Sequence, residues 1–202
     1  SFHETKNIIS GEGGLLIVNR EEYTKRAEII WEKGTNRAAF YRGEVDKYGW
    51  VDIGSSYLPS DAVAAFLYTQ LVRFDSIQTK RKRVWQTYHA ALAPLEAKGV
   101  LHRPVVPDFA TVNGNLYYIT VDSMETRDAL LEYLKKSGIS AVFHYLPLHN
   151  SPYFRERHDG RQLPNTLRFS DTLIRLPFYN TLKPSSIRLI AETIASFFSG
   201  KM

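Results

Sequence analysis

Hydrophobic and polar positions change their period along the chain, and these changes predict its first elements. The apolar run LLIV at 15–18 follows the glycine-rich GEGG and predicts a short buried strand. Asn19 can cap a helix over 20–33, and Glu22 stands where a capping box requires an acid. Residues 34–59 show no clear period but are rich in glycine and aromatic residues, which predicts a long, ordered loop.

The later part of the chain is more regular. A strong helical signal opens at Ser60 and continues to about residue 98, with a break near 73–76. Beyond it the pattern predicts strands over 115–121, 139–145 and 173–179, and helices over 125–138 and 184–198. We therefore predict an α/β fold with a short sheet covered by helices. The domain boundary is placed near 72–78, which gives domains of 1–74 and 75–202.

The composition is that of a globular protein with a large core. Of 202 residues 44% are apolar and 23% are charged, and 12 Tyr, 11 Phe and 3 Trp are present. No apolar run is long enough to span a bilayer, so we expect no membrane association. The absence of cysteine excludes disulfides, thiolate metal sites and cysteine nucleophiles from this stretch, and it is compatible with a cytoplasmic protein.

The formal charge of +5 raises the question of an anionic partner. The densest basic run, 80–83, lies within a helical pattern, so we interpret it as a solvated helix face. A nucleic-acid site would have interleaved aromatic residues and more clustered charge, so no nucleic acid is expected. A modest positive field would also suit an anionic small substrate.

Lys6 lies in a setting that suits a phosphorylated ligand. The segment is SFHETKNIISGEGG, with Ser1, His3 and Thr5 before the lysine and three glycines after it. Hydroxyl groups and glycines favour a close approach of the backbone to phosphate. A lysine there can pair with the phosphate or, if desolvated, act as a nucleophilic amine. An ordinary surface lysine is the alternative, and a Rossmann site is excluded because GEGG lacks the GxGxxG spacing.

The segment HYLPLH carries two histidines, His144 and His149, with a proline between them. This spacing fits neither a helical nor a finger-like metal site, so no metal is expected. Each histidine is interpreted as a satisfied core or pocket residue. No Ser-His-Asp arrangement can be singled out, since many serines and aspartates would serve equally well.

The segments SFHETKN and GEGGLLIVN resemble the cofactor-lysine segment of the DegT/StrS sugar-nucleotide aminotransferases, which are fold-type I enzymes that use pyridoxal phosphate. The resemblance covers the whole chain and continues through EIIWEKGTNRAAFY, VDIGSSYLPSDAVAAF and AVFHYLPLHNSPYF. Within the group, this combination is similar to the transaminases that form dTDP-4-amino-4,6-dideoxygalactose. Many relatives carry a GYNYR-type motif where this chain has GSSYL at 54–58, so the phosphate contact expected there departs from the family pattern.

The resemblance implies the C-terminal portion of a fold-type I aminotransferase. Residues 1–74 would be the end of the cofactor-binding large domain, and 75–202 a small α/β domain. The family's aspartate on the pyridine nitrogen, its aromatic residue stacked on the ring and its phosphate turn cannot be found in this chain. We therefore expect the chain alone to bind the cofactor weakly and to turn over poorly.

The resemblance also implies roles for single residues. Lys6 would hold the cofactor and then move a proton between the donor's α-carbon and the cofactor. That role requires an amine that can be neutral, which burial and a nearby positive charge would promote. Ser1 would donate a hydrogen bond to the cofactor phosphate, and His3 would line the same region. Ser56 and Tyr57 would reach the phosphate of the neighbouring subunit's cofactor, since family active sites lie at a homodimer interface.

The substrate side follows from the same resemblance. Residues 34–45 and 144–149 would border the sugar-nucleotide pocket, with Tyr145 and His149 as substrate-binding residues. The implied reaction moves an amino group from L-glutamate to the 4-keto carbon of a dTDP-6-deoxyhexose, for a surface polysaccharide. Sugar dehydratases of the family carry histidine where Lys6 stands, so the lysine argues against that activity. The other alternative is an inactive fragment, or a module for dimerisation and sugar-nucleotide binding.

Overall fold

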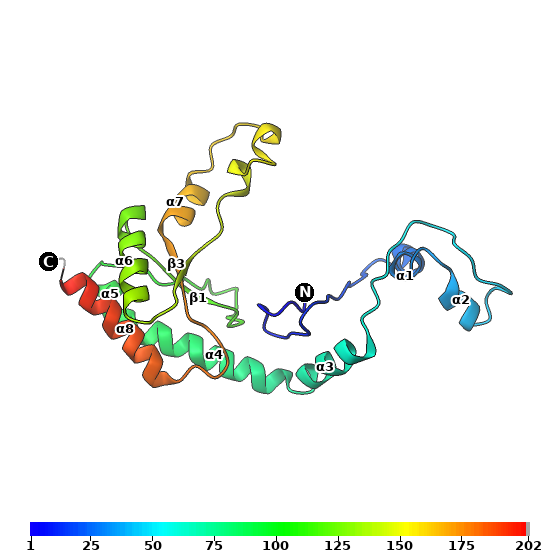
Figure 1. Cartoon of the computed structure of the whole chain (residues 1–202), viewed down its shortest axis with the longest axis horizontal. Helices are drawn as coiled ribbons and strands as arrows, with labels where there is room; N and C mark the ends of the chain where they lie inside the picture. The colour runs from blue at the N-terminus through cyan, green and yellow to red at the C-terminus, as the bar shows by residue number, and fades with distance from the viewer. Residues whose placement is uncertain (201–202) are drawn as a thin grey trace. The chain divides into compact units, whose positions relative to one another are not determined.

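The computed structural model describes residues 1–200, drawn in Figure 1. Contacts within the chain divide it into two compact units, Ser1–Phe74 and Asp75–Met202. The division falls inside the range 72–78, while the assignment of the first unit to a cofactor-binding domain stays a prediction. Within residues 1–200, no helix combines the length and the apolar character needed to cross a bilayer.

The first unit is made of short helices and long hydrogen-bonded loops. A 3-10 helix leads into α1, and two further helices follow: η1 (Glu21–Tyr23), α1 (Thr24–Trp31), α2 (Arg37–Tyr41) and α3 (Asp61–Leu71). Helix α3 begins where predicted, because the Ser60 hydroxyl accepts a hydrogen bond from the Val63 amide at 3.4 Å. The expected irregular loop is confirmed apart from α2.

Two predictions for this unit are wrong. Residues 15–18 form no strand, and Leu15, Leu16 and Ile17 are exposed, because no neighbouring strand within residues 1–74 satisfies their backbone hydrogen bonds. The capping box does not form either. Arg20 is the N-cap residue and its side chain makes no capping bond, while Glu22 pairs with Arg20 instead.

The second unit contains a small antiparallel sheet in the order β1-β3-β2: β1 (Tyr117–Thr120), β2 (Val142–Phe143) and β3 (Leu173–Leu176). The central strand β3 begins directly after a helix. Strand β2 is therefore shorter than the predicted 139–145. In the register Val142↔Arg175 and Phe143↔Ile174, the partners beyond Leu173 already belong to that helix.

Helices cover this sheet, as predicted: α4 (Phe74–Ala91), α5 (Ala93–Ala97), α6 (Met124–Lys136), α7 (Pro164–Thr172) and α8 (Pro184–Ser199), with η2 (Leu148–Asn150) and η3 (Arg155–Arg157) between β2 and α7. Helix α6 packs against α7, α8, β2 and β3. The core joins the inner residues of β1 and β3 to the helices, with Tyr88, Tyr117, Ile174 and Ile187 fully buried. Burial of such large apolar side chains is the main stabilising contribution to this unit.

The basic run at 80–83 is not simply a solvated face. Arg81 is only 7% exposed, whereas its three neighbours in the run are exposed. Its guanidinium donates to the Gly114 carbonyl at 2.7 Å, the Asn115 carbonyl at 2.8 Å and the Asn180 side chain at 3.2 Å. These three hydrogen bonds offset the free-energy cost of burying the guanidinium, so Arg81 is part of the framework of the second unit.

Candidate functional site

Lys6 lies on a turn whose two arms are held together by backbone hydrogen bonds. The Phe2 amide donates to the Gly13 carbonyl at 2.9 Å, and the Ser10 amide donates to the Phe2 carbonyl at 2.7 Å. A bond of 2.9 Å from the Lys6 amide to the His3 carbonyl closes the turn. The backbone position from which the lysine side chain projects is therefore fixed by local bonds.

The glycines of GEGG let the second arm return beside the first. Gly11 and Gly13 have φ values of 84° and 143°, which favour glycine. A Cβ on Gly13 would lie 3.0 Å from the hydroxyl of Ser10. That hydroxyl is buried and donates to the Glu12 carbonyl at 2.6 Å, so it has little room to move. The glycine-rich run is thus a requirement of the turn itself.

His3 is held in one tautomer. Its Nδ1 accepts a hydrogen bond from the Thr5 amide at 3.2 Å, and the Thr5 hydroxyl lies 2.9 Å from the same nitrogen. Because an amide N–H can only donate, Nδ1 carries no proton, and the ring proton resides on Nε2. Nε2 faces the Glu12 carboxylate at 3.4 Å. His3 therefore links the two arms around Lys6.

The functional groups of Lys6 and Ser1 are available for a ligand. Lys6 is exposed, and within residues 1–200 its amine takes part in no hydrogen bond or ion pair. The Ser1 hydroxyl accepts a bond from the His3 amide at 3.4 Å, which leaves its own proton free to donate. The turn thus presents a primary amine and a hydroxyl donor.

Ser56 and Tyr57 lie on a loop that runs back along the first unit and is hydrogen-bonded to the end of α1. The Ser55 amide donates to the Ile30 carbonyl at 3.1 Å, and the Tyr57 amide donates to the Trp31 carbonyl at 3.2 Å. Both predicted site residues are exposed. Within residues 1–200, no hydrogen bond or ion pair joins either of them to Lys6, Ser1 or His3.

Asp52 forms a second set of hydrogen bonds that hold the same loop against α1. Its carboxylate accepts a hydrogen bond from Arg26 of α1 at 2.9 Å and one from the Ile53 amide at 2.7 Å. These two donors, the arginine first, lower the pKa of Asp52 below its ordinary value. The loop is therefore tied to α1 by side chains as well as by backbone.

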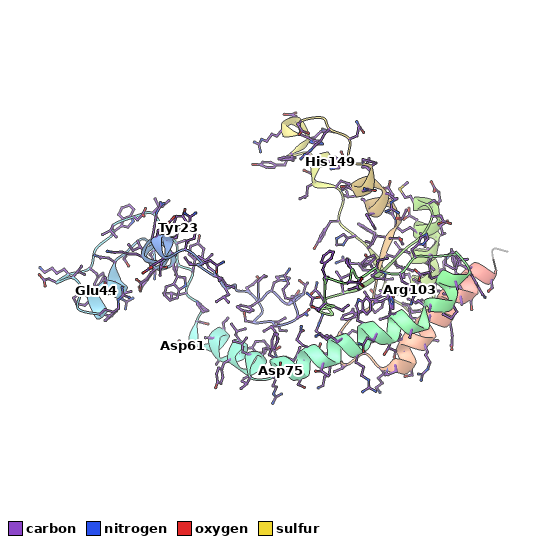
Figure 2. All side chains as sticks on the ribbon, turned by 180° about the vertical axis from the view of Figure 1, so that it is seen from behind. Tyr23, Glu44, Asp61, Asp75, Arg103 and His149 are labelled. Atoms are coloured by element: carbon purple, nitrogen blue, oxygen red, sulfur yellow. The ribbon has the colours of Figure 1, made fainter. Side chains whose placement is uncertain are left out.

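An open groove of about 1050 Å³ runs along α1. Leu15, Leu16, Trp31 and Tyr57 line it together with the backbone of 13–14. Figure 2 labels Tyr23, another lining residue, at the start of this helix. The structure thus brings Tyr57 and the end of the GEGG segment onto one mostly apolar groove of the same chain.

Tyr145 and His149 belong to the second unit. Tyr145 is 75% exposed, and the guanidinium of Arg175 lies 5.6 Å from the centre of its ring. Figure 2 shows His149 on the irregular segment between β2 and α7. Its ring lies 5.0 Å from that of His158. Tyr145 therefore has its neighbour on β3, whereas His149 has its neighbour within the segment itself.

Comparison with known proteins decides the family of the chain. The model of the DegT/DnrJ/EryC1/StrS aminotransferase family matches residues 1–195. The chain belongs to this family.

Solved structures agree on the fold of this family member. The aminotransferase TlmJ from Streptoalloteichus hindustanus is 21% identical with a TM-score of 0.84, over 100% of this chain and 52% of that one. PseC from Helicobacter pylori, an aminotransferase involved in the biosynthesis of pseudoaminic acid, is 22% identical with a TM-score of 0.85. The match covers 99% of this chain and 52% of PseC. The putative sugar aminotransferase Spr1654 from Streptococcus pneumoniae, solved in a PLP-form, is 22% identical with a TM-score of 0.79, and the match covers 100% of this chain and 51% of that one.

The chain therefore spans about half the length of these solved relatives. Its fold is that of the C-terminal portion of a fold-type I aminotransferase, as predicted. At these identities the likeness establishes the fold, and the activity of the whole protein is treated below as a proposal.

The turn around Lys6 fits the cofactor that the family implies. Pyridoxal phosphate offers a carbonyl group to a lysine amine and a phosphate group to hydrogen-bond donors. The free amine of Lys6 and the available hydroxyl of Ser1 supply one group of each kind on a single short turn. The expected burial of Lys6 is not provided by residues 1–200, where the side chain is exposed.

One interpretation of the histidines is wrong, and it reveals a residue that sequence reasoning missed. His144 was expected to be satisfied, but its Nδ1 is buried and has no hydrogen-bond partner within residues 1–200. Burial first, and then the charge of Arg175, lower the pKa of His144. Arg175 has a signal in the sequence, since it is the only charged residue in the apolar run LIRLPF.

Proposed function

We propose that this chain is part of a pyridoxal phosphate-dependent sugar aminotransferase. The reaction takes the amino group of L-glutamate, which leaves as 2-oxoglutarate, and puts it in place of the ketone oxygen of a dTDP-4-keto-6-deoxyhexose. The product is dTDP-4-amino-4,6-dideoxygalactose, a precursor for a surface polysaccharide such as enterobacterial common antigen. A cytoplasmic homodimer with active sites at its interface is part of the proposal.

The observation that carries the proposal is the free amine of Lys6 on its fixed turn. Its backbone is held by the bond to the His3 carbonyl at 2.9 Å, while its side chain has no partner within residues 1–200. The same short turn also presents the available hydroxyl of Ser1. A fixed backbone with an uncommitted amine suits a residue that must form a bond with a ligand.

Each residue of the turn has a separate task in this proposal. Lys6 holds the cofactor and afterwards carries a proton from the α-carbon of the donor, as a general base and then a general acid. Ser1 donates its hydroxyl proton to the phosphate. His3, whose ring is oriented by Thr5, keeps the two arms of the turn together through Glu12. The bound cofactor supplies the electron sink that stabilises negative charge at the α-carbon.

The first test asks whether Lys6 holds the cofactor. The purified protein is incubated with pyridoxal phosphate, reduced with borohydride, weighed by mass spectrometry and mapped after proteolysis. We expect one cofactor, attached to Lys6, and none in Lys6→Arg. Lys25→Arg, which changes another exposed lysine of the first unit, should label like the wild type. Attachment spread evenly over surface lysines would refute the assignment.

A second test concerns the substrate. The holoenzyme is given L-glutamate and dTDP-4-keto-6-deoxyglucose, and formation of 2-oxoglutarate is followed while the sugar product is identified by NMR. We expect an amine at C4 with the galacto configuration. A holoenzyme that converts another keto-sugar but leaves this one unchanged would retain the aminotransferase activity and refute the substrate.

A further inference from the structure

The loop before β1 contains the only asparagine of the chain that a glycine follows, Asn113, with Gly114 after it. Asparagine can lose ammonia when the next amide nitrogen of the main chain attacks its side-chain carbon, Cγ. Glycine hinders this attack least, because it has no Cβ. The side chain of Asn113 is exposed, so water can reach it and ammonia can leave. The pair therefore has the composition and the access that this reaction requires.

The loop also activates the group that would be attacked. The Asn115 amide donates a hydrogen bond to Oδ1 of Asn113 at 3.0 Å. Because an amide N–H can only donate, the atom that faces it is the oxygen, and the side-chain nitrogen remains as the leaving group. Attack at Cγ puts negative charge on Oδ1, and a donor already placed at that oxygen stabilises the charge.

The attacking nitrogen is available as well. Within residues 1–200 the Gly114 amide takes part in no hydrogen bond. The carbonyl of the same amide group, that of Asn113, accepts a bond from the Gln78 side chain at 3.3 Å, which draws electron density away from the nitrogen. The Arg81 guanidinium donates to the Gly114 carbonyl at 2.7 Å, so a positive charge lies close to the amide as it loses its proton.

The same loop has no room for a longer main chain. A Cβ on Gly114 would lie 2.9 Å from the main-chain carbonyl carbon of Arg81 in α4. The φ of Gly114 is 62°, which favours glycine, and Arg81 binds the carbonyls of both Gly114 and Asn115 in this conformation. Any insertion into the main chain here would move these two acceptors away from the guanidinium.

We propose that Asn113 is a site of spontaneous covalent modification to aspartate or isoaspartate, and that isoaspartate releases the loop from Arg81. The Gly114 nitrogen loses its proton and bonds to Cγ of Asn113. The bond from Cγ to Nδ2 breaks, and Nδ2 takes up a proton from water and leaves as ammonia, which gives a cyclic succinimide. Water then opens the ring, and no oxidant or reductant takes part. The reaction is independent of the proposed aminotransferase activity.

The two products differ in the path of the main chain. Water that attacks Cγ restores the original main chain and leaves an aspartate at position 113. Water that attacks the main-chain carbonyl instead leaves isoaspartate, in which the chain runs through Cβ and Cγ and is longer by one carbon. Only isoaspartate therefore lengthens the loop that packs against Arg81.

Peptide mapping by mass spectrometry tests the site. The purified full chain is kept in mildly alkaline buffer and sampled over time, and electron-transfer fragmentation distinguishes isoaspartate from aspartate. Asn150, which is exposed and precedes a serine, is the internal control. We expect Asn113 to convert about tenfold or more faster than Asn150, the effect of one hydrogen bond to a developing charge.

A synthetic peptide with the sequence of 110–117 shows that the buffer supports the reaction. If this peptide converts while Asn113 of the protein stays intact, the modification site is refuted. Conversion of Asn113 and Asn150 at equal rates refutes the activation by the loop. The variant Asn113→Gln should not form the product at this position.

Urea unfolding then tests the link to Arg81. The isoaspartate fraction, separated by chromatography, is compared with the wild type and with Asn113→Asp, which carries the same added charge on an unchanged main chain. We expect a lower unfolding midpoint for the isoaspartate fraction alone. Equal midpoints for isoaspartate and wild type overturn the inferred release of the loop. An equal loss in Asn113→Asp overturns it too, because the added charge would then be the cause.

Discussion

Gly34 and Gly54 cross so closely that a Cβ on Gly54 would lie 2.1 Å from the amide nitrogen of Gly34. In the other direction, a Cβ on Gly34 would lie 1.8 Å from the Asp52 carbonyl oxygen. The crossing is closed by a hydrogen bond of 2.8 Å from the Val51 amide to the Gly34 carbonyl. It holds the loop that carries Ser56 against the end of α1.

Gly54→Ala should therefore destabilise the first unit. The added methyl group meets backbone, which cannot rotate away as a side chain can, so we expect a loss of about 3 kcal/mol. Urea unfolding followed by tryptophan fluorescence measures this loss. Gly49→Ala is the matched control, because a Cβ there meets nothing within 4 Å. Equal stability of the two variants would show that the crossing is not needed.

Arg81→Met tests the framework of the second unit. The substitution keeps a long apolar side chain but removes the donors to the Gly114 and Asn115 carbonyls. Leaving these acceptors unmatched should cost about 3 kcal/mol in the free energy of unfolding. Arg83→Met changes an exposed arginine two residues along α4 and should stay within about 0.5 kcal/mol of the wild type.

The helices were predictable because their signals are local. Ser60 caps α3, and Ser123 caps α6 by accepting a hydrogen bond from the Thr126 amide at 3.2 Å. Gly138 follows Ser137, the C-cap residue of α6, with a φ of 75°, the left-handed conformation that favours glycine after a helix end. Such signals lie within a few residues of the element that they define, so the sequence pattern is sufficient to locate it.

The features that were missed depend on distant partners. Residues 15–18 have the composition of a strand, yet a strand needs a neighbour to pair with. Arg81 lies in a basic run, and its acceptors are more than 30 residues away in the chain. Arg175 could be noticed as a lone charge in an apolar run, but only the fold shows that its Nε is buried without a hydrogen-bond partner in residues 1–200.

Tyr88 and Tyr117 should make the second unit sensitive to alkali. Both are fully buried, and burial raises the pKa of each phenol above the ordinary value of 10.0. Since the folded chain holds these protons more tightly than the unfolded chain, stability is intact below about pH 10 and falls as the pH rises beyond it. The free energy of unfolding, measured at roughly pH 9 and pH 11, should show this fall.

The matched variants for this prediction are Tyr88→Phe and Tyr153→Phe. Tyr88→Phe removes the bond to the Pro177 carbonyl at 2.8 Å, so it should cost about 1 kcal/mol at neutral pH and reduce the alkaline loss. Tyr153 is 77% exposed, and Tyr153→Phe should leave both quantities unchanged. A wild type whose stability is constant up to roughly pH 11, which lies above the ordinary pKa of a phenol, would contradict the expected loss.

The final prediction concerns the assembly of the proposed site. If Ser56 contacts the cofactor phosphate, Ser56→Ala should weaken cofactor binding about tenfold or more, the usual cost of a hydrogen bond to a charged group. The neighbouring exposed serine gives the control, since Ser55→Ala should bind cofactor like the wild type. Cofactor occupancy at limiting concentration is read from absorbance.

Mixing two variants then reveals which subunit supplies Ser56. A mixed dimer of Lys6→Ala and Ser56→Ala chains has one doubly altered site and one intact site if Lys6 and Ser56 act across the interface. In that case mixing restores wild-type affinity and activity to a share of the sites. If both residues act within one chain, every site keeps one defect and mixing restores nothing. The second result would place Lys6 and Ser56 of each active site in a single subunit, because neither chain could then repair the other.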